Sequence, residues 1–198
     1  MSSNFFLYLP YPIECINNCT KTLTENFKED VNVITKLSFE KEINFGILWI
    51  DTHGIKRETN GKDFLLLVKQ EDFKPEYQKY LVVNQSNGKV YLPSIYLPIM
   101  FNVKNSIIIM DNCYSSEIDI KTLSTWKSNL IFTTGYIRDY YTEVETGMIK
   151  AIRLVFEELK KRFNIDKFDY ITVLQYKDLI NKGFEEINKK FNTEYNLF

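Results

Sequence analysis

Two stretches of the chain place an uninterrupted apolar run directly before a cluster of polar residues. Residues 45–54 have the sequence F-G-I-L-W-I-D-T-H-G, and residues 105–116 have the sequence N-S-I-I-I-M-D-N-C-Y-S-S. Runs that are apolar and β-branched throughout, rather than alternating with polar residues, are typical of strands buried on both faces of a parallel sheet. We therefore expect two buried strands, with His53 following the end of the first and Cys113 following the end of the second.

Shorter apolar runs and helical periodicities surround these two stretches. Further strands are predicted at 5–9, 31–35, 63–69, 80–84, 90–92 and 129–133, with a strand or helix start at 169–173. Apolar residues three and four positions apart predict helices at 13–27, 142–159 and 177–191. The sequence S-N-G-K at 86–89 predicts a hairpin turn with positive φ at both Asn87 and Gly88. Ser94 is expected to cap a short helix that runs to Phe101.

Strands that alternate with helices indicate an α/β fold. We expect a three-layer sandwich, in which a mostly parallel sheet has helices on both faces and carries a small β-hairpin insertion. No repeat, low-complexity tract or Gly/Ser-rich linker interrupts the pattern, so residues 1–198 are expected to form a single domain.

Composition narrows the range of functions. Hydrophobic residues make up 44% of the chain, which is enough for a substantial core, and the formal net charge is −1. No basic patch favours nucleic acid, no apolar run approaches the ~20 residues of a membrane span, and no signal-peptide pattern is present. Three cysteines, an odd and small number, favour a reducing, cytoplasmic setting over a disulfide framework.

His53 and Cys113 are candidate catalytic residues because both follow strand ends, where sites form in open α/β sheets. Cysteine attacks as a thiolate, and an imidazole can accept its proton and later protonate a leaving amine. The backbone N–H groups of Gly54 and Cys113 are candidate oxyanion donors. The alternative is that the chain's one histidine and this cysteine are unrelated structural residues.

Cys15 and Cys19 lie one helical turn apart in the predicted helix 13–27. We interpret them as small residues that pack in the core, because a metal pair needs further ligands and His53 is engaged elsewhere. We expect no metal and no cofactor.

The arrangement of these motifs resembles the caspase-like cysteine peptidases of the caspase–haemoglobinase clan. An apolar strand followed by His53-Gly54 precedes a second apolar strand that ends at Cys113, and the gap is 60 residues against about 50 in caspases. Residues 111–115, D-N-C-Y-S, are similar to the D-x-C-H-S motif of metacaspases. Residues 14–18, E-C-I-N-N, are similar to their G-C-x-N-D block, and Y-K-D-L at 176–179 is similar to their late T-Y-x-D-L segment.

This resemblance implies a caspase-like sheet and an endopeptidase mechanism. Cys113 would be the nucleophile, His53 the general acid/base and Gly54 an oxyanion donor. Only about fifteen residues separate Cys113 from the next predicted strand, so the long cleavable linker of caspases is missing. That compactness is closer to the bacterial CHAT domains, which implies activation by a regulatory protein partner or by self-association.

The resemblance also implies a substrate preference. Metacaspases and paracaspases, which cut after arginine or lysine, carry an aspartate at the position of Asp111. We expect Asp111 to bind that side chain of a protein or peptide substrate, with Asp51, Asn18 and Glu14 as helpers. Asn18 stands where metacaspases have aspartate, and Asp51 where many have serine. The alternative is that Asp51 and Asp111 only cap backbone N–H groups of the turns that follow them.

Two other classes of protein remain open. One is a catalytically inactive caspase-like module that binds a partner, which the paired cysteine and histidine argue against. The other is a flavodoxin-type ligand-binding domain, which ranks lower because no Gly-rich phosphate loop follows the first strand.

Overall fold

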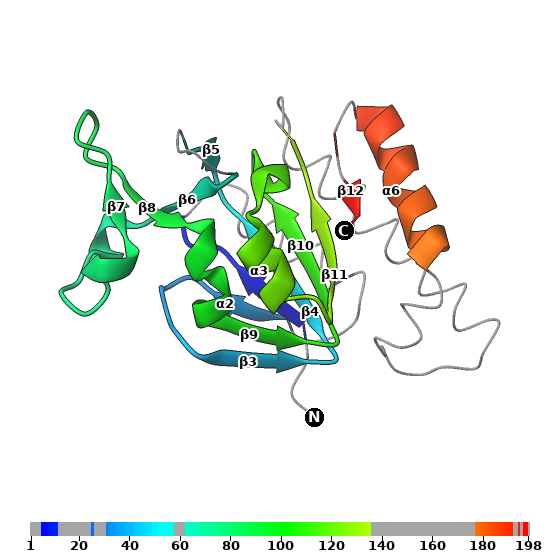
Figure 1. The fold of residues 1–198 in the computed structure, drawn as a ribbon, viewed down its shortest axis with the longest axis horizontal. Helices are drawn as coiled ribbons and strands as arrows, with labels where there is room; N and C mark the ends of the chain where they lie inside the picture. Colours follow the sequence, from blue (N-terminus) through cyan, green and yellow to red (C-terminus); the bar gives the residue numbers. More distant parts are fainter. Residues whose placement is uncertain are drawn as a thin grey trace.

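A six-stranded sheet forms the centre of the computed structural model, which describes residues 5–11, 25, 31–57, 62–135, 177–191, 194, 196 and 197 (Figure 1). The strands lie in the order β12-β11-β10-β4-β1-β2. All neighbours are parallel except β12, which is antiparallel to β11. The strands are β1 (Phe5–Tyr8), β2 (Asn32–Ile34), β4 (Ile47–Asp51), β10 (Ile107–Asp111), β11 (Leu130–Thr133) and β12 (Asn196–Leu197). The prediction of an α/β fold with a mostly parallel sheet is confirmed.

Strands β4 and β10 lie side by side in the middle of this sheet, and every residue of both strands is buried. Successive side chains point to opposite faces of a strand. Leu48 and Met110 therefore belong to the large core cluster on one face, whereas Trp49 and Ile109 point to the other. Burial on both faces explains why these two sequences are apolar without interruption.

One face of the sheet packs against short helices. The elements are η3 (Ser94–Tyr96), α2 (Leu97–Met100) and α3 (Ile120–Thr125), and Figure 1 shows α2 and α3 in front of the strands. Met100 of α2, and Trp126 directly after α3, share a core cluster with Leu48 and Met110. This packing buries one side of the sheet.

Helix α6 (Lys177–Phe191) has the predicted bounds and contacts β11. The ring of Phe184 stacks on Phe132, with 4.3 Å between centroids. Phe132 alternates with Ile131, a residue of the core cluster, so α6 contacts the sheet from the opposite side. The predicted helix 142–159 lies outside the described residues. So does the predicted helix 13–27, except for Glu25. The three-layer sandwich therefore stays a prediction.

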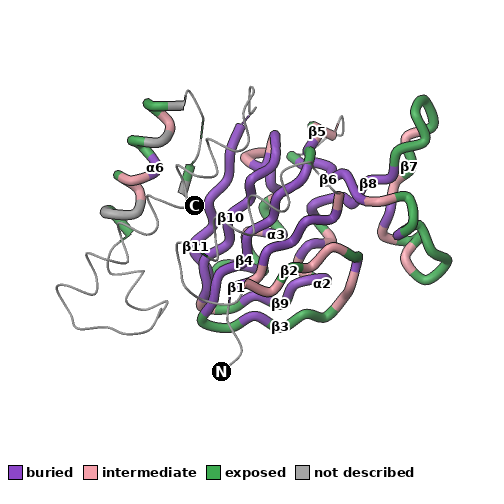
Figure 2. The backbone as a smooth tube through the Cα atoms, turned by 180° about the vertical axis from the view of Figure 1, so that it is seen from behind, coloured by how far each residue is buried: buried purple, intermediate pink, exposed green. Residues whose placement is uncertain are grey.

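Two smaller sheets flank the main one. Strands β3 (Lys41–Asn44) and β9 (Phe101–Lys104) form a parallel pair. An antiparallel sheet has the order β5-β6-β8-β7, and its outer part, around β7, is largely exposed (Figure 2). Its strands are β5 (Gly54–Lys56), β6 (Phe64–Val68), β7 (Val82–Val83) and β8 (Val90–Pro93), with the 3₁₀ turns η1 (Gln70–Asp72) and η2 (Gln78–Tyr80) between β6 and β7.

The strand pairs β3–β9 and β4–β10 share one register. Residue n pairs with residue n + 60 in both sheets, from Lys41 with Phe101 to Asp51 with Asp111. Each of the two segments turns between its strands through one residue with a left-handed backbone. That residue is Phe45 (φ 54°) in the first segment and Asn105 (φ 50°) in the second. Residues 41–51 and 101–111 thus run side by side as two copies of one strand–turn–strand unit.

Two local predictions were wrong in detail. Ser94 does not cap a helix, because its hydroxyl donates to Asp63 Oδ1 at 2.6 Å, and the segment from 94 is a 3₁₀ turn and a short helix that gives way to β9 at Phe101. The hairpin between β7 and β8 is present, but only Gly88 has positive φ (68°). Its N–H donates to Asn84 O at 2.8 Å, so the loop is longer than a two-residue turn.

None of the helices in the described part of the chain has the length and apolar character required to cross a membrane. The strand or helix start predicted at 169–173 lies outside the described residues.

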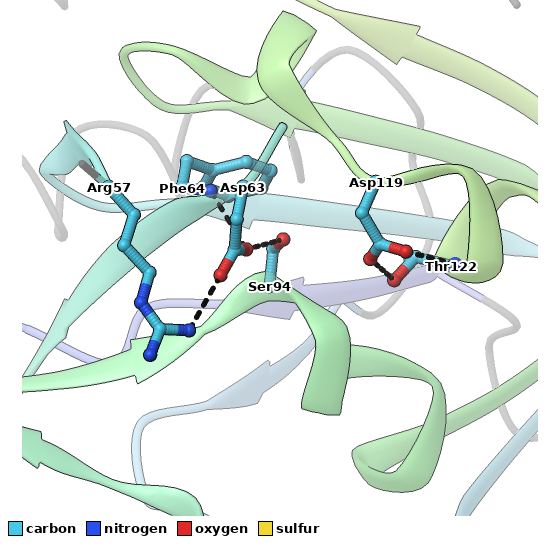
Figure 3. Close-up of polar contacts among 6 residues, drawn as sticks. All are labelled: Arg57, Asp63, Phe64, Ser94, Asp119 and Thr122. Atoms are coloured by element: carbon cyan, nitrogen blue, oxygen red, sulfur yellow. Dashed lines mark hydrogen bonds and ion pairs between the residues drawn. The ribbon is translucent and has the colours of Figure 1, made fainter. Parts of the chain in front are cut away.

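Asp63 joins three segments near the main sheet, and its bonds predict a large loss of stability when it is removed. Its carboxylate accepts from Arg57 Nη1 (2.9 Å), from the Phe64 N–H (2.9 Å) and from the Ser94 hydroxyl (Figure 3). Asp63→Ala leaves a buried hydroxyl and a partly buried guanidinium without their acceptor, so we expect a loss of about 2–3 kcal/mol in the free energy of unfolding.

Asp119→Ala is the matched control, measured by urea denaturation. Asp119 caps α3 through the N–H groups of Lys121 and Thr122, and loss of such a cap costs ~1 kcal/mol. Equal losses for the two variants would contradict the role given to Asp63.

Candidate active site

The strands that carry the two candidate catalytic residues are neighbours in the sheet. Asp51 pairs with Asp111 as the last pair of the β4–β10 ladder, and His53 and Cys113 each follow two residues later. The register offset equals the 60-residue gap between His53 and Cys113. Both residues therefore leave equivalent points of adjacent parallel strands, about 5 Å apart.

The backbone after His53 touches the backbone of Cys113. A Cβ atom built on Gly54 would overlap the carbonyl oxygen of Cys113 and would lie 2.9 Å from Asn112 Nδ2. A real side chain at residue 54 is therefore excluded unless this part of the structure moves. The Lys56 ammonium lies 3.3 Å from the Glu117 carboxylate, so β5 is also joined to the 3₁₀ turn η4 (Ser115–Glu117) that follows Cys113.

The ladder between β5 and β6 directs the Gly54 N–H away from β6. The Leu67 N–H donates to His53 O at 2.9 Å, and the Arg57 N–H donates to Asp63 O at 3.2 Å. Hydrogen-bonded pairs alternate with non-bonded pairs in antiparallel strands, and Gly54 occupies a non-bonded position opposite Leu66. Because this N–H is not used in the β5–β6 hydrogen bonds, it is better suited to donate to an oxyanion than an N–H that is bonded within the sheet.

Cys113 occupies a sharp turn at the end of β10 and is buried, with 8% of its surface exposed. Tyr114 has a left-handed backbone (φ 64°), and its N–H donates to Gly135 O at 2.8 Å. The hydroxyl of Ser115 donates to Met110 O at 2.9 Å and accepts from the Thr134 N–H at 2.7 Å. The Cys113 turn is thus attached on both sides, to β10 and to the end of β11.

His53 is exposed to solvent, unlike the residues on either side of it. Thr52, which precedes it, is held by the bond from its hydroxyl to Leu67 O at 2.8 Å. Partial desolvation by the surrounding atoms, and secondarily the positive charge of Lys89, lower the pKa of His53 from its ordinary 6.5. A lowered pKa favours the neutral imidazole at neutral pH, which is the form that can accept a proton.

The other predicted site residues divide into two groups. Asp51 and Asp111 are 0% and 1% exposed and project from the same face of paired strands, so their carboxylates are neighbours. Asn18 and Glu14 lie outside the described residues, as do Cys15 and Cys19. Among the described residues, no three His, Cys, Asp or Glu side chains are grouped closely enough to hold a metal ion.

Sequence reasoning overlooked two residues of this region. Asn112 is fully buried, and its Nδ2 donates to Cys113 O at 3.2 Å. Lys89 acts on His53 from the start of β8. A polar residue at the end of an apolar strand was a signal for Asn112, but nothing in the sequence places Lys89 near His53.

No family model matches the chain, and a search of curated proteins finds no match.

The close approach of residue 54 to Cys113 predicts that Gly54→Ala disturbs the candidate site. The added methyl overlaps a backbone oxygen, so we expect a loss of about 1–3 kcal/mol in the free energy of unfolding, and a changed alkylation rate of Cys113. Gly88→Ala is the control, because it adds a methyl in open space at positive φ, costs roughly 1–2 kcal/mol and leaves Cys113 unaffected. Unchanged Cys113 reactivity in Gly54→Ala would contradict the contact.

The single histidine allows a direct measurement of its pKa. We expect the imidazole resonance in the proton NMR spectrum to titrate below pH 6.5 in the folded protein. Lys89→Met removes a positive charge that disfavours the imidazolium, so this variant should titrate at higher pH than the wild type. Lys121→Met, which changes an exposed lysine of α3, serves as the control. A wild-type midpoint above 6.5 would contradict the environment described for His53.

Proposed function

We propose that the chain is a caspase-like cysteine endopeptidase in which Cys113 is the nucleophile and His53 the general acid/base. The observation that supports this most is the common register of β4 and β10, which extends to the strand ends from which His53 and Cys113 emerge. The contact between Gly54 and the Cys113 carbonyl also keeps the segments that follow β4 and β10 together beyond the strand ends. The resemblance of H-G and D-x-C-x-S to the motifs of metacaspases supports the same assignment.

The proposed reaction assigns one step to each of these groups. The imidazole of His53 accepts the thiol proton, and the sulfur of Cys113 attacks the carbonyl carbon of the scissile peptide. The N–H groups of Gly54 and Cys113 stabilise the negative charge on the carbonyl oxygen. The imidazolium then protonates the leaving amine, and water hydrolyses the thioester. The lowered pKa of His53 favours the first step because the ring is neutral before the attack.

We also propose cleavage after arginine or lysine, with Asp111 as the main determinant and Asp51 beside it. Two buried carboxyl groups lie on one face at the ends of adjacent strands, in a poorly solvated place. A guanidinium pairs with such groups in bidentate geometry more strongly than it does in open water. Asn18 and Glu14 are proposed as helpers of the same pocket.

Regulation by binding completes the proposal. The segment between Cys113 and β11 holds η4 and α3, and its short length leaves little chain to be cut. Activation by a protein partner or by self-association fits this better than activation by cleavage between these elements.

The catalytic assignment predicts that Cys113→Ala and His53→Ala each abolish peptide cleavage while the fold is retained. Each variant removes one half of the acyl-transfer couple. Turnover of peptides with arginine before the cut should be measured at several protein concentrations, because activation by self-association depends on them. Ser86→Ala, on the exposed hairpin loop, serves as the control. Wild-type turnover in either folded dyad variant would rule out the dyad.

The pocket assignment predicts a preference between two fluorogenic peptides that differ only in arginine or aspartate before the cut. We expect the arginine peptide to be favoured, and Asp111→Asn to reduce kcat/KM for it by about tenfold or more, since a charge-assisted pair is lost. Preference for aspartate, or unchanged arginine selectivity in Asp111→Asn, would favour the alternative that the two aspartates only cap backbone N–H groups of the turns that follow them.

A further inference from the structure

Asn112 occupies the junction between the two proposed oxyanion donors. Its side chain is fully buried, its Nδ2 donates to Cys113 O at 3.2 Å, and the same Nδ2 lies against Gly54, where a Cβ would come within 2.9 Å of it. One amide nitrogen thus contacts the residues that carry both donors. The amide orientation follows from chemistry, because the flipped form would place two oxygens against each other.

The bonds around Cys113 fix the peptide groups on both sides of it. The carbonyl of Asn112 accepts from the Ser115 N–H at 3.3 Å, and in a trans peptide this directs the Cys113 N–H the opposite way. On the other side, the Cys113 carbonyl accepts from Asn112 Nδ2 while the Tyr114 N–H donates to Gly135 O at 2.8 Å. The Cys113 carbonyl thus accepts a hydrogen bond from the side chain of the preceding residue, Asn112.

We propose that Asn112 is a positioning residue that sets the Cys113 and Gly54 N–H groups in the geometry an oxyanion requires, an inference that rests on the proposed function. Loss of its amide leaves the Cys113–Tyr114 peptide group held by the Tyr114 N–H alone, so the Cys113 carbonyl can turn, and Gly54, which packs on that oxygen, shifts with it. Both donors then move from their places together. A misplacement of ~1 Å costs up to about a hundredfold in rate, and loss of a donor costs about 10²–10³.

The test compares two reactions of the same sulfur, only one of which builds an oxyanion. With p-nitrophenyl acetate, the sulfur attacks the ester carbonyl, an S–C bond forms, the C–O bond breaks, p-nitrophenolate leaves with the electron pair, and His53 takes the thiol proton. With iodoacetamide, an S–C bond forms, the C–I bond breaks, iodide leaves with the electron pair and His53 takes the thiol proton, without charge developing on a carbonyl oxygen. The ratio of the two rates at Cys113, located by mass spectrometry, cancels changes in thiol reactivity.

The variants are Asn112→Ala, which leaves space, and Asn112→Asp, which keeps the shape without the donor. We expect the ratio of acylation to alkylation to fall by about tenfold or more in both. Asn129→Ala is the matched control, because Asn129 is also buried and its amide donates to Val103 O (2.8 Å) and Trp126 O (3.1 Å), away from Cys113. A purely structural role for Asn112 would lower stability in all three variants and leave the ratio at the wild-type value.

The outcomes separate this inference from the proposed function. An unchanged ratio in either folded Asn112 variant overturns the inference. If the wild type is acylated at Cys113 and cleaves no peptide at any protein concentration, a self-activated peptidase is excluded, and the ratio still decides the role of Asn112. If folded wild type is not acylated at Cys113 at all, both are overturned.

Discussion

The shared register of two parallel strand pairs is the constraint on which the candidate site depends. Strands β3 and β4 run beside β9 and β10 with one constant offset, and the last pair joins Asp51 to Asp111. Since side chains alternate between faces with period two, a slip of one residue would turn every side chain of one segment to the opposite face. Burial on both sides of the central strands fixes this register and, with it, the relation between His53 and Cys113.

The two segments diverge after their aspartates, and the divergence gives each functional residue its own environment. The first continues into the antiparallel sheet, with His53 exposed to solvent and near Lys89. The second folds back in a left-handed turn that buries Cys113. Gly54 keeps the two in contact because it lacks a side chain where the Cys113 carbonyl lies. An exposed imidazole and a largely buried thiol that follow the ends of neighbouring strands would suit the proposed acyl transfer.

The sequence predicted the parts of the fold that depend on local pattern. The central strands were visible because burial on both faces leaves an uninterrupted apolar run, and α6 because its apolar residues recur at helical spacing. The β3–β9 pair was not predicted, because each strand is only four residues long and the alternation of β9 is too short to stand out. The partner of Ser94, the left-handed backbone at Tyr114 and the bond from Asn112 depend on tertiary contacts that one sequence does not show.

The proposed dyad requires that His53 activates Cys113. Labelling with a peptidyl chloromethylketone that ends in arginine tests it directly, because the probe needs both a substrate pocket and an activated thiolate. Mass spectrometry should find the label on Cys113 rather than Cys15 or Cys19, with a rate that falls at least about tenfold in His53→Ala. Labelling of Cys113 at the same rate without His53, or equal labelling of all three cysteines, would contradict the account.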